Sequence, residues 1–170
     1  MDNNELFKRL RYALQIDDPT ARRILKQGSF EATTAQVGAW RLSDSEAEFD
    51  ACPNEAIAAF LAGYIVERRG ARDDKPVPAP STSRIHNNTV LKMLKIALEM
   101  RSEDVLSILT TDGASFSTSE VSALLRKPGS RNYRQCGDQV LRRFIDGVGR
   151  SQRDDTTPSV WAEAPKTAGK

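Results

Sequence analysis

Apolar residues recur at helical spacing along most of the chain, and the pattern occurs twice. Leu6, Leu10 and Leu14 fall on one face of a helix, and so do Val90 and Leu94, which occupy the positions 84 residues after the first two. No segment shows the sustained alternation of apolar and polar residues that is typical of a half-buried strand. The pattern therefore predicts an all-α protein.

The recurrence is a sequence repeat at a fixed offset of 84 residues. Residues 3–69 align with 87–153 without a gap, and 15 of the 67 pairs are identical, where average residue usage predicts about four. Most identities are apolar positions of the helical pattern, but they also include the pairs Asn3/Asn87, Asn4/Asn88, Cys52/Cys136 and Gly63/Gly147. We interpret the chain as two tandem, pseudo-symmetric four-helix repeats.

Helix-start signals place the four helices of each repeat. Asn4 and Asn88 are expected to cap the first helix, and Asp17 and Ser102 to open the second. The third helix begins at a capping box in both repeats, Thr33-x-x-Gln36 in one and Ser117-x-x-Glu120 in the other.

The fourth helix is expected to start at Pro53 in the first repeat and at 137–138 in the second, since proline suits the first helical position. Gly63 and Gly147 fall inside these fourth helices. A glycine there costs roughly 1 kcal/mol against alanine, so its presence in both repeats predicts a close helix crossing.

The composition between and after the repeats differs from that of the helices. We predict repeats at 3–70 and 87–153, joined by a linker at 71–86 that contains prolines and serines, as an extended, partly stiff tether would. The tail, 154–170, has no periodicity and is predicted to be disordered. Trp161 in the tail is either a stray apolar residue or an anchor that folds back.

Composition excludes several classes of protein. The chain has 170 residues, of which 39% are apolar, which is enough for a packed core. Its mean hydropathy is −0.51, and neither a long uncharged apolar run nor a signal peptide is visible, so we expect a cytoplasmic protein with no membrane association. With two cysteines and one histidine, we predict no metal site and no cofactor.

Three strings of the second repeat resemble a known family. They are Asn87-Asn88-x-Val90-Leu91-Lys92, Ser119-Glu120-Val121-Ser122-Ala123-Leu124 and Asn132-Tyr133-Arg134-x-Cys136-Gly137-Asp138-Gln139. They resemble the YehS-like family of bacterial proteins, and the similarity extends over both repeats, although the first departs from the third string at Phe49-Asp50-Ala51-Cys52. The resemblance implies a tandem bacterial cytoplasmic protein of unknown function, and it supplies no catalytic residue.

The two repeats carry different charge. The first has nine Lys and Arg against ten Asp and Glu, whereas the second has eleven against seven. The contrast is strongest before the fourth helix. The acidic loop, 42–50, holds four carboxylates and no cation, and the equivalent basic loop, 126–134, holds four cations and no carboxylate.

Three interpretations of the basic loop remain open at this stage. It is a solvated connection, a contact for a polyanion such as RNA or DNA, or a surface that docks onto the acidic loop within one chain or between chains. The residues of the polyanion interpretation are Lys92, Lys95, Arg126, Lys127, Arg131, Asn132, Tyr133, Arg134, Arg142 and Arg143.

Catalytic chemistry finds little support in the sequence. Cys52 and Cys136 precede the fourth helices and are expected to be small buried residues, although a thiolate at a helix N-terminus would be reactive. The glycines form no phosphate-binding loop. We therefore predict a non-catalytic binding or adaptor module, with no small-molecule ligand. Nucleic acid is the favoured partner, and a protein partner or homo-oligomer formed through loops 42–50 and 126–134 is the alternative.

Overall fold

The computed structural model describes residues 1–77 and 79–153, so the predicted tail and Trp161 lie outside the described residues. Within these ranges the chain forms helices and a single isolated bridge between Arg72 and Lys75. The helices are α1 (Asn3–Ala13), α2 (Asp18–Gln27), α3 (Thr34–Ala39), α4 (Asn54–Arg69), α5 (Asn87–Ala97), α6 (Ser102–Thr110), α7 (Thr118–Leu125) and α8 (Asp138–Arg153). The all-α prediction is confirmed, and α5 to α8 begin 84 residues after α1 to α4.

The observed helix starts agree in part with those predicted from the sequence. Both capping boxes are present. The hydroxyls of Thr33 and Ser117 accept from the backbone N–H of the residue three positions on, and the side chain of that residue accepts from the backbone N–H of Thr33 or Ser117. Pro53 was expected inside α4, but its extended backbone (φ −71°, ψ 157°) makes it the N-cap, and the helix starts one residue later. Asn4 and Asn88 were expected as caps of the first helices, and this prediction is wrong.

The residues that precede those asparagines cap the helices instead. The carboxylate of Asp2 accepts from the backbone N–H of Glu5 at the start of α1. In the second repeat, the N-cap is His86, whose backbone carbonyl accepts from the N–H of Val90. The asparagine side chains are thereby free for contacts with the loops before α4 and α8.

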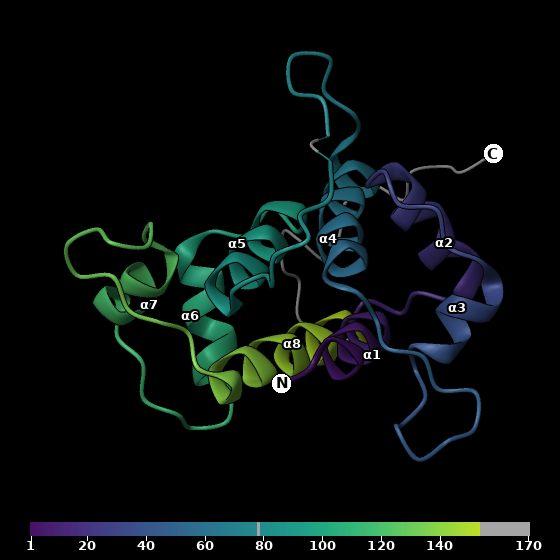
Figure 1. Cartoon of the computed structure of the whole chain (residues 1–170). Coiled ribbons are helices and arrows are strands. Elements are labelled where there is room, and N and C mark those ends of the chain that lie inside the picture. The colour runs from purple at the N-terminus through teal and green to yellow at the C-terminus, as the bar shows by residue number, and fades with distance from the viewer. Residues whose placement is uncertain (78, 154–170) are drawn as a thin grey trace.

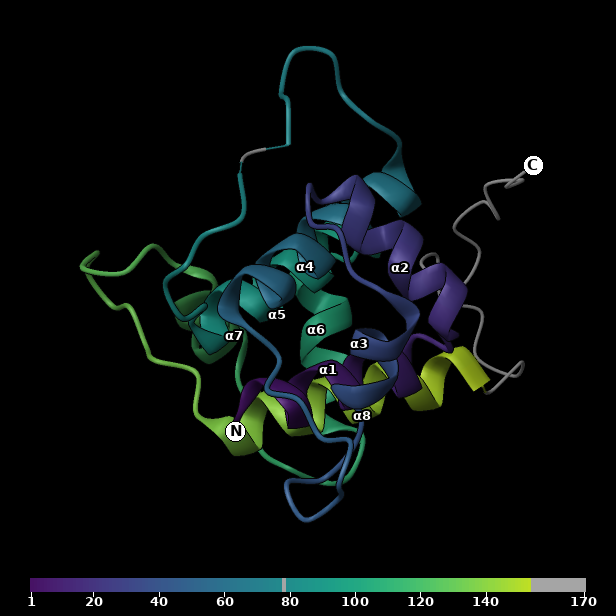
Figure 2. The same cartoon turned by 45° about the vertical axis from the view of Figure 1, so that its right-hand side comes forward.

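The two repeats exchange their first and last helices. Helix α1 lies beside α8 of the other repeat, and α5 lies beside α4 (Figures 1 and 2). Within each repeat, the second helix packs against the fourth and the third against the second. Since α1·α8 and α5·α4 are equivalent pairs, the fold has two junctions of the same kind, one at each side of the shared core.

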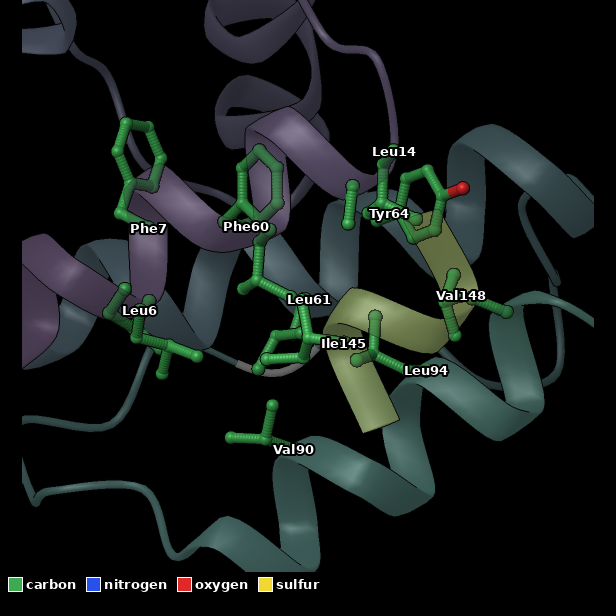
Figure 3. Close-up of a cluster of buried hydrophobic side chains, with 14 of the residues drawn as sticks. Leu6, Phe7, Leu14, Phe60, Leu61, Tyr64, Val90, Leu94, Ile145 and Val148 are labelled. Carbon is green, nitrogen blue, oxygen red and sulfur yellow. The ribbon is translucent and has the colours of Figure 1, made fainter. Parts of the chain in front are cut away.

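The core is continuous across the repeats. Figure 3 shows Phe60 and Leu61 of α4 together with Leu6 of α1, Val90 of α5 and Ile145 of α8. Each of these five side chains is at most 5% exposed. The apolar stripes of α1, α4, α5 and α8 thus become fully buried only when both repeats are folded together.

Glycines permit the closest helix contacts, as predicted. A Cβ at Gly63 would lie 1.8 Å from the carbonyl oxygen of Ile24, and one at Gly28 would lie 1.8 Å from that of Ala59. Helices α2 and α4 therefore touch backbone to backbone. At Gly147 the nearest atom is the side-chain Cγ2 of Ile108, at 2.5 Å. The crossing of α6 and α8 is thus close but is lined by a side chain.

Candidate functional site

The basic loop is fixed to the body of the protein by a buried asparagine. The Asn88 side-chain amide donates to the carbonyls of Leu124 and Arg134, at 2.9 and 2.8 Å. Its oxygen accepts from the backbone N–H of Cys136 and from the hydroxyl of Tyr133, at 2.9 and 3.1 Å. These bonds tie the end of α7 to the segment before α8, so the loop between them is held at its base.

The acidic loop is fixed in the same way. Asn4 donates to the carbonyls of Trp40 and Asp50 and accepts from the N–H of Cys52, the counterpart of Cys136. Because two loops of opposite charge are held by the same clamp, the clamp does not require either charge. The signal for it in the sequence was that asparagine occupies the same position, Asn4 and Asn88, at the start of both repeats.

Three cations of the basic loop are exposed and unpaired. Arg126, Lys127 and Arg131 are exposed, and none of their side chains forms a hydrogen bond or ion pair with the described residues. Arg134 differs, because its guanidinium lies 2.8 Å from a carboxylate oxygen of Glu120. The loop extends away from the helices, at the left of both views in green (Figures 1 and 2).

The structure separates the other residues that the sequence grouped with this loop. Arg142 belongs to the junction of α1 and α8, where it donates to Glu5. Tyr133 is half-buried and uses its hydroxyl on Asn88. Lys92 and Asn132 are exposed, and Lys95 and Arg143 are half-buried without an ion pair to any described residue. The unpaired charge thus concentrates at Arg126, Lys127 and Arg131, with Lys92 on α5.

The acidic loop lies on a different side of the molecule in both views, in blue at the bottom (Figures 1 and 2). Asp44 and Glu48 are exposed and unpaired among the described residues. Glu46 accepts from the backbone and hydroxyl of Ser43, which lowers its pKa. No hydrogen bond or ion pair joins residues 42–50 to 126–134, so docking of the loops within one chain is not what this structure shows.

Both cysteines are buried and free. Burial raises the pKa of the Cys52 thiol to about 12 and that of Cys136 to about 11. The nearby carboxylates of Asp50 and Asp138 act in the same direction. The interpretation as small buried residues is therefore favoured over that of a reactive thiolate.

A groove between α1 and α8 was not anticipated from the sequence. It has a volume of about 1370 Å³, and the turn before α2 and residues 41–42 contribute to its lining. Its lining residues include Lys8, Arg9, Arg11, Tyr12, Arg41, Arg150 and Arg153 among the cations and aromatics, and Glu5, Asp17 and Asp146 among the acids. These residues come from opposite ends of the chain, so only the exchange of helices brings them together.

Most charges in the groove are already paired. Arg9 donates to both oxygens of Asp146, at 3.1 and 3.2 Å. Arg11 is 5% exposed and lies 2.5 Å from a carboxylate oxygen of Asp18, which also pairs with Arg41 at 3.3 Å. Burial lowers the pKa of Arg11, and the bond to Asp18 opposes that shift.

The fold and the clamped loops define a duplicated, all-α protein with two related junctions. The chain belongs to the family described as "protein of unknown function (DUF1456)", which matches twice, at residues 3–70 and 87–154. It is 38% identical over 152 residues to the "Uncharacterized protein YehS" of Escherichia coli (strain K12), covering 89% of this chain and 97% of that protein. No solved structure matches. None of the described helices is long and apolar enough to cross a membrane.

Proposed function

We propose that the protein is a non-catalytic module that binds nucleic acid through its basic loop. The observation that carries the proposal is the set of three exposed cations, Arg126, Lys127 and Arg131, which have no carboxylate partner among the described residues. Phosphate contacts by such side chains supply most of the sequence-independent affinity for a nucleic acid. Lys92 on the neighbouring α5 supplies a further exposed cation.

The internal repeat supports this proposal. At the equivalent place, the first repeat holds the same asparagine clamp but carries Asp44, Glu46 and Glu48. The loop therefore folds with either sign of charge, and the basic residues are not explained by the stability of the loop. A contact with an anionic partner explains why the second repeat differs from the first.

The composition of α7 favours recognition of a single strand or of the phosphate backbone over recognition of base edges in the major groove of a duplex. A recognition helix presents polar and basic side chains to base edges. The sequence of α7, Thr118–Leu125, contains no Arg or Lys. We accordingly expect affinity that depends on phosphate charge and that varies little with sequence.

The test compares binding to a labelled single-stranded RNA and to a duplex DNA at low salt. The triple variant Arg126→Ala, Lys127→Ala, Arg131→Ala is expected to lose at least about ten-fold in affinity. A matched control removes three exposed cations elsewhere, with Lys26→Ala, Arg72→Ala and Lys75→Ala, and is expected to bind as the wild type does. Equal losses in both variants would remove the case for a site at the loop.

Self-association is the second candidate function. The exposed, unpaired carboxylates of Asp44 and Glu48 complement the cations of the basic loop, and the two loops lie on different sides of the molecule (Figures 1 and 2). Such surfaces can meet only between two chains, head to tail. Sedimentation would then show an assembly that dissociates in the Arg131→Glu variant. Adding Asp44→Lys and Glu48→Lys to that variant should restore the assembly. A monomer at all concentrations rejects this candidate.

A further inference from the structure

The groove between α1 and α8 has a counterpart elsewhere in the same molecule. The equivalent junction lies between α5 and α4, which are the counterparts of α1 and α8 in the repeat. The groove positions Tyr12, Arg41, Asp146 and Arg150 correspond there to Ile96, Leu125, Ala62 and Val66. All four of these counterparts are half-buried. At these four positions the equivalent junction has apolar side chains, although it keeps cations at Lys92 and Arg69, the counterparts of Lys8 and Arg153. Packing therefore does not account for the ring and the charges at these four positions of the groove.

Tyr12 is the most unusual member of that lining. It is 71% exposed, and the guanidinium carbon of Arg153 lies 4.8 Å from the centre of its ring. The arginine covers part of the ring by a cation–π contact and leaves the rest in the open groove. An exposed tyrosine beside an arginine is a platform on which a planar base can stack.

Lys8 supplies a cation at a distance from Tyr12 that would suit the phosphate of a nucleotide stacked on the ring. It stands one helical turn before Tyr12 on α1, and side chains with that spacing lie about 5–6 Å apart at their Cβ atoms. This separation is comparable with the distance from the base to the 5′-phosphate of a nucleotide. Lys8 is exposed, and it forms no ion pair with any described residue.

The acids of the groove do not oppose an anion at this point, because each is engaged elsewhere. Glu5 accepts from Arg142 and Arg9, and Asp146 accepts from Arg9. Asp17 caps α2. In contrast, neither Lys8 nor Arg153 forms an ion pair within 1–77 and 79–153. The carboxylate nearest in effect to Lys8 is that of Glu46 in the acidic loop, whose pKa Lys8 helps to lower without a direct bond.

One of the lining residues, Arg11, has an unused donor. Arg11 is 5% exposed, and its Nε and Nη2 donate to the carbonyl of Ile16. Its Nη1 is buried and has no hydrogen-bond partner among the described residues. Buried polar atoms of this kind are uncommon, but Nη1 has almost no exposed surface, so it does not by itself mark a ligand contact.

We propose that this groove binds a nucleotide, with the base on Tyr12 and the phosphate beside Lys8. The ligand is a free nucleotide or one unit of a single strand, which present the same chemistry. The basic loop takes no part in this site, so the inference stands apart from the proposed function of that loop.

The experiment uses calorimetric titration of the full chain with AMP, adenosine and ribose 5-phosphate. AMP is expected to bind more tightly than either fragment. Tyr12→Ala should weaken AMP binding about five-fold or more, and Tyr12→Phe, which keeps the ring, should restore it. Lys8→Ala should lower the affinity for AMP to that for adenosine. Lys75→Ala removes an exposed cation outside the groove and should leave AMP binding unchanged.

Two further titrations identify the source of the ligand and separate this site from the loop. The dinucleotide pApA binding more tightly than AMP assigns the groove to a strand, and equal affinity assigns it to a free nucleotide. The triple loop variant is expected to bind AMP as the wild type does. The proposal is overturned if neither AMP nor pApA binds at millimolar concentration, or if Tyr12→Ala leaves their affinity unchanged while circular dichroism shows a native fold.

Discussion

Arg142 of α8 donates two hydrogen bonds, of 2.8 and 3.1 Å, to the carboxylate of Glu5 in α1. The two residues stand 137 positions apart in the chain, and their contact joins the first helix of one repeat to the last helix of the other. At the equivalent junction, the corresponding residues are Thr89 and Ala58. The two junctions of this pseudo-symmetric fold are therefore held by different chemistry.

This pair makes stability depend on pH in acid. The bonds from Arg142, helped by that from Arg9, lower the pKa of Glu5 to about 2, from 4.5 for an ordinary glutamate side chain. A carboxyl with a lowered folded-state pKa stabilises the protein above its unfolded pKa, and that contribution is lost as pH falls toward 2.

Glu5→Gln is therefore expected to lower the free energy of unfolding by about 1 kcal/mol at pH 7. The difference from the wild type should shrink between pH 4.5 and 2. Urea unfolding across this range is the measurement, and Glu103→Gln, an exposed acid in the first turn of α6, is the control. A difference that stays constant down to pH 2 would contradict the assignment.

Asn88→Ala is expected to destabilise the protein strongly. Its side chain is engaged in four hydrogen bonds at a 6% exposed position. Loss of that side chain leaves backbone groups of the clamp without partners, at a cost of about 2 kcal/mol or more. Thermal unfolding checks this, with the exposed neighbour Thr89→Ala as the matched variant. Equal melting temperatures for the two variants would show that the clamp contributes little.

Alanine substitutions at three glycines should fall in a definite order. Gly63→Ala forces a Cβ to within 1.8 Å of a backbone oxygen, so it is expected to cost more than about 3 kcal/mol or prevent folding. Gly147→Ala meets a side chain that can shift, and about 1–2 kcal/mol is expected. Gly38→Ala in α3 meets nothing within 4 Å and should be neutral or stabilising by up to about 1 kcal/mol. Chemical denaturation that gives another order contradicts the account of the crossings.

The thiols of Cys52 and Cys136 are expected to react slowly in the native protein. Both are buried, with pKa values raised to about 12 and about 11, and the thiolate is the reactive form. Labelling with a thiol-specific chromogenic disulfide at pH 8 should proceed at the rate of local or global opening and become fast in denaturant. Complete labelling of one thiol within seconds under native conditions would show that it is accessible.

Sequence reasoning succeeded where the signal is local. The capping boxes at Thr33 and Ser117 and the crossing glycine Gly63 follow from the preferences of a few adjacent residues. The exchange of α1 and α5 between repeats could not be predicted, because an amphipathic face shows that a helix is buried but not which helix covers it. For the same reason, Arg142 looked like a free cation.

The asparagine clamp and the groove lay beyond sequence reasoning for related causes. Asn4 and Asn88 stand at helix starts, where asparagine usually caps, and their true partners are 36 to 48 residues away. Tyr12 and Arg153 meet only because α1 and α8 pack together. A repeat comparison that marked where the two copies differ in polarity, as at Tyr12 and Ile96, would have pointed to this junction.

The salt dependence of nucleic-acid binding tests the central claim most directly. Each phosphate contact contributes about 0.7 to the slope of log K against log salt for a single strand. Anisotropy of a labelled single-stranded RNA should therefore give a slope that is shallower by up to about 2 when Arg126, Lys127 and Arg131 are alanine. The control variant with Lys26, Arg72 and Lys75 changed to alanine should keep the wild-type slope. Identical slopes for all three proteins would contradict the assignment of the basic loop as the nucleic-acid contact.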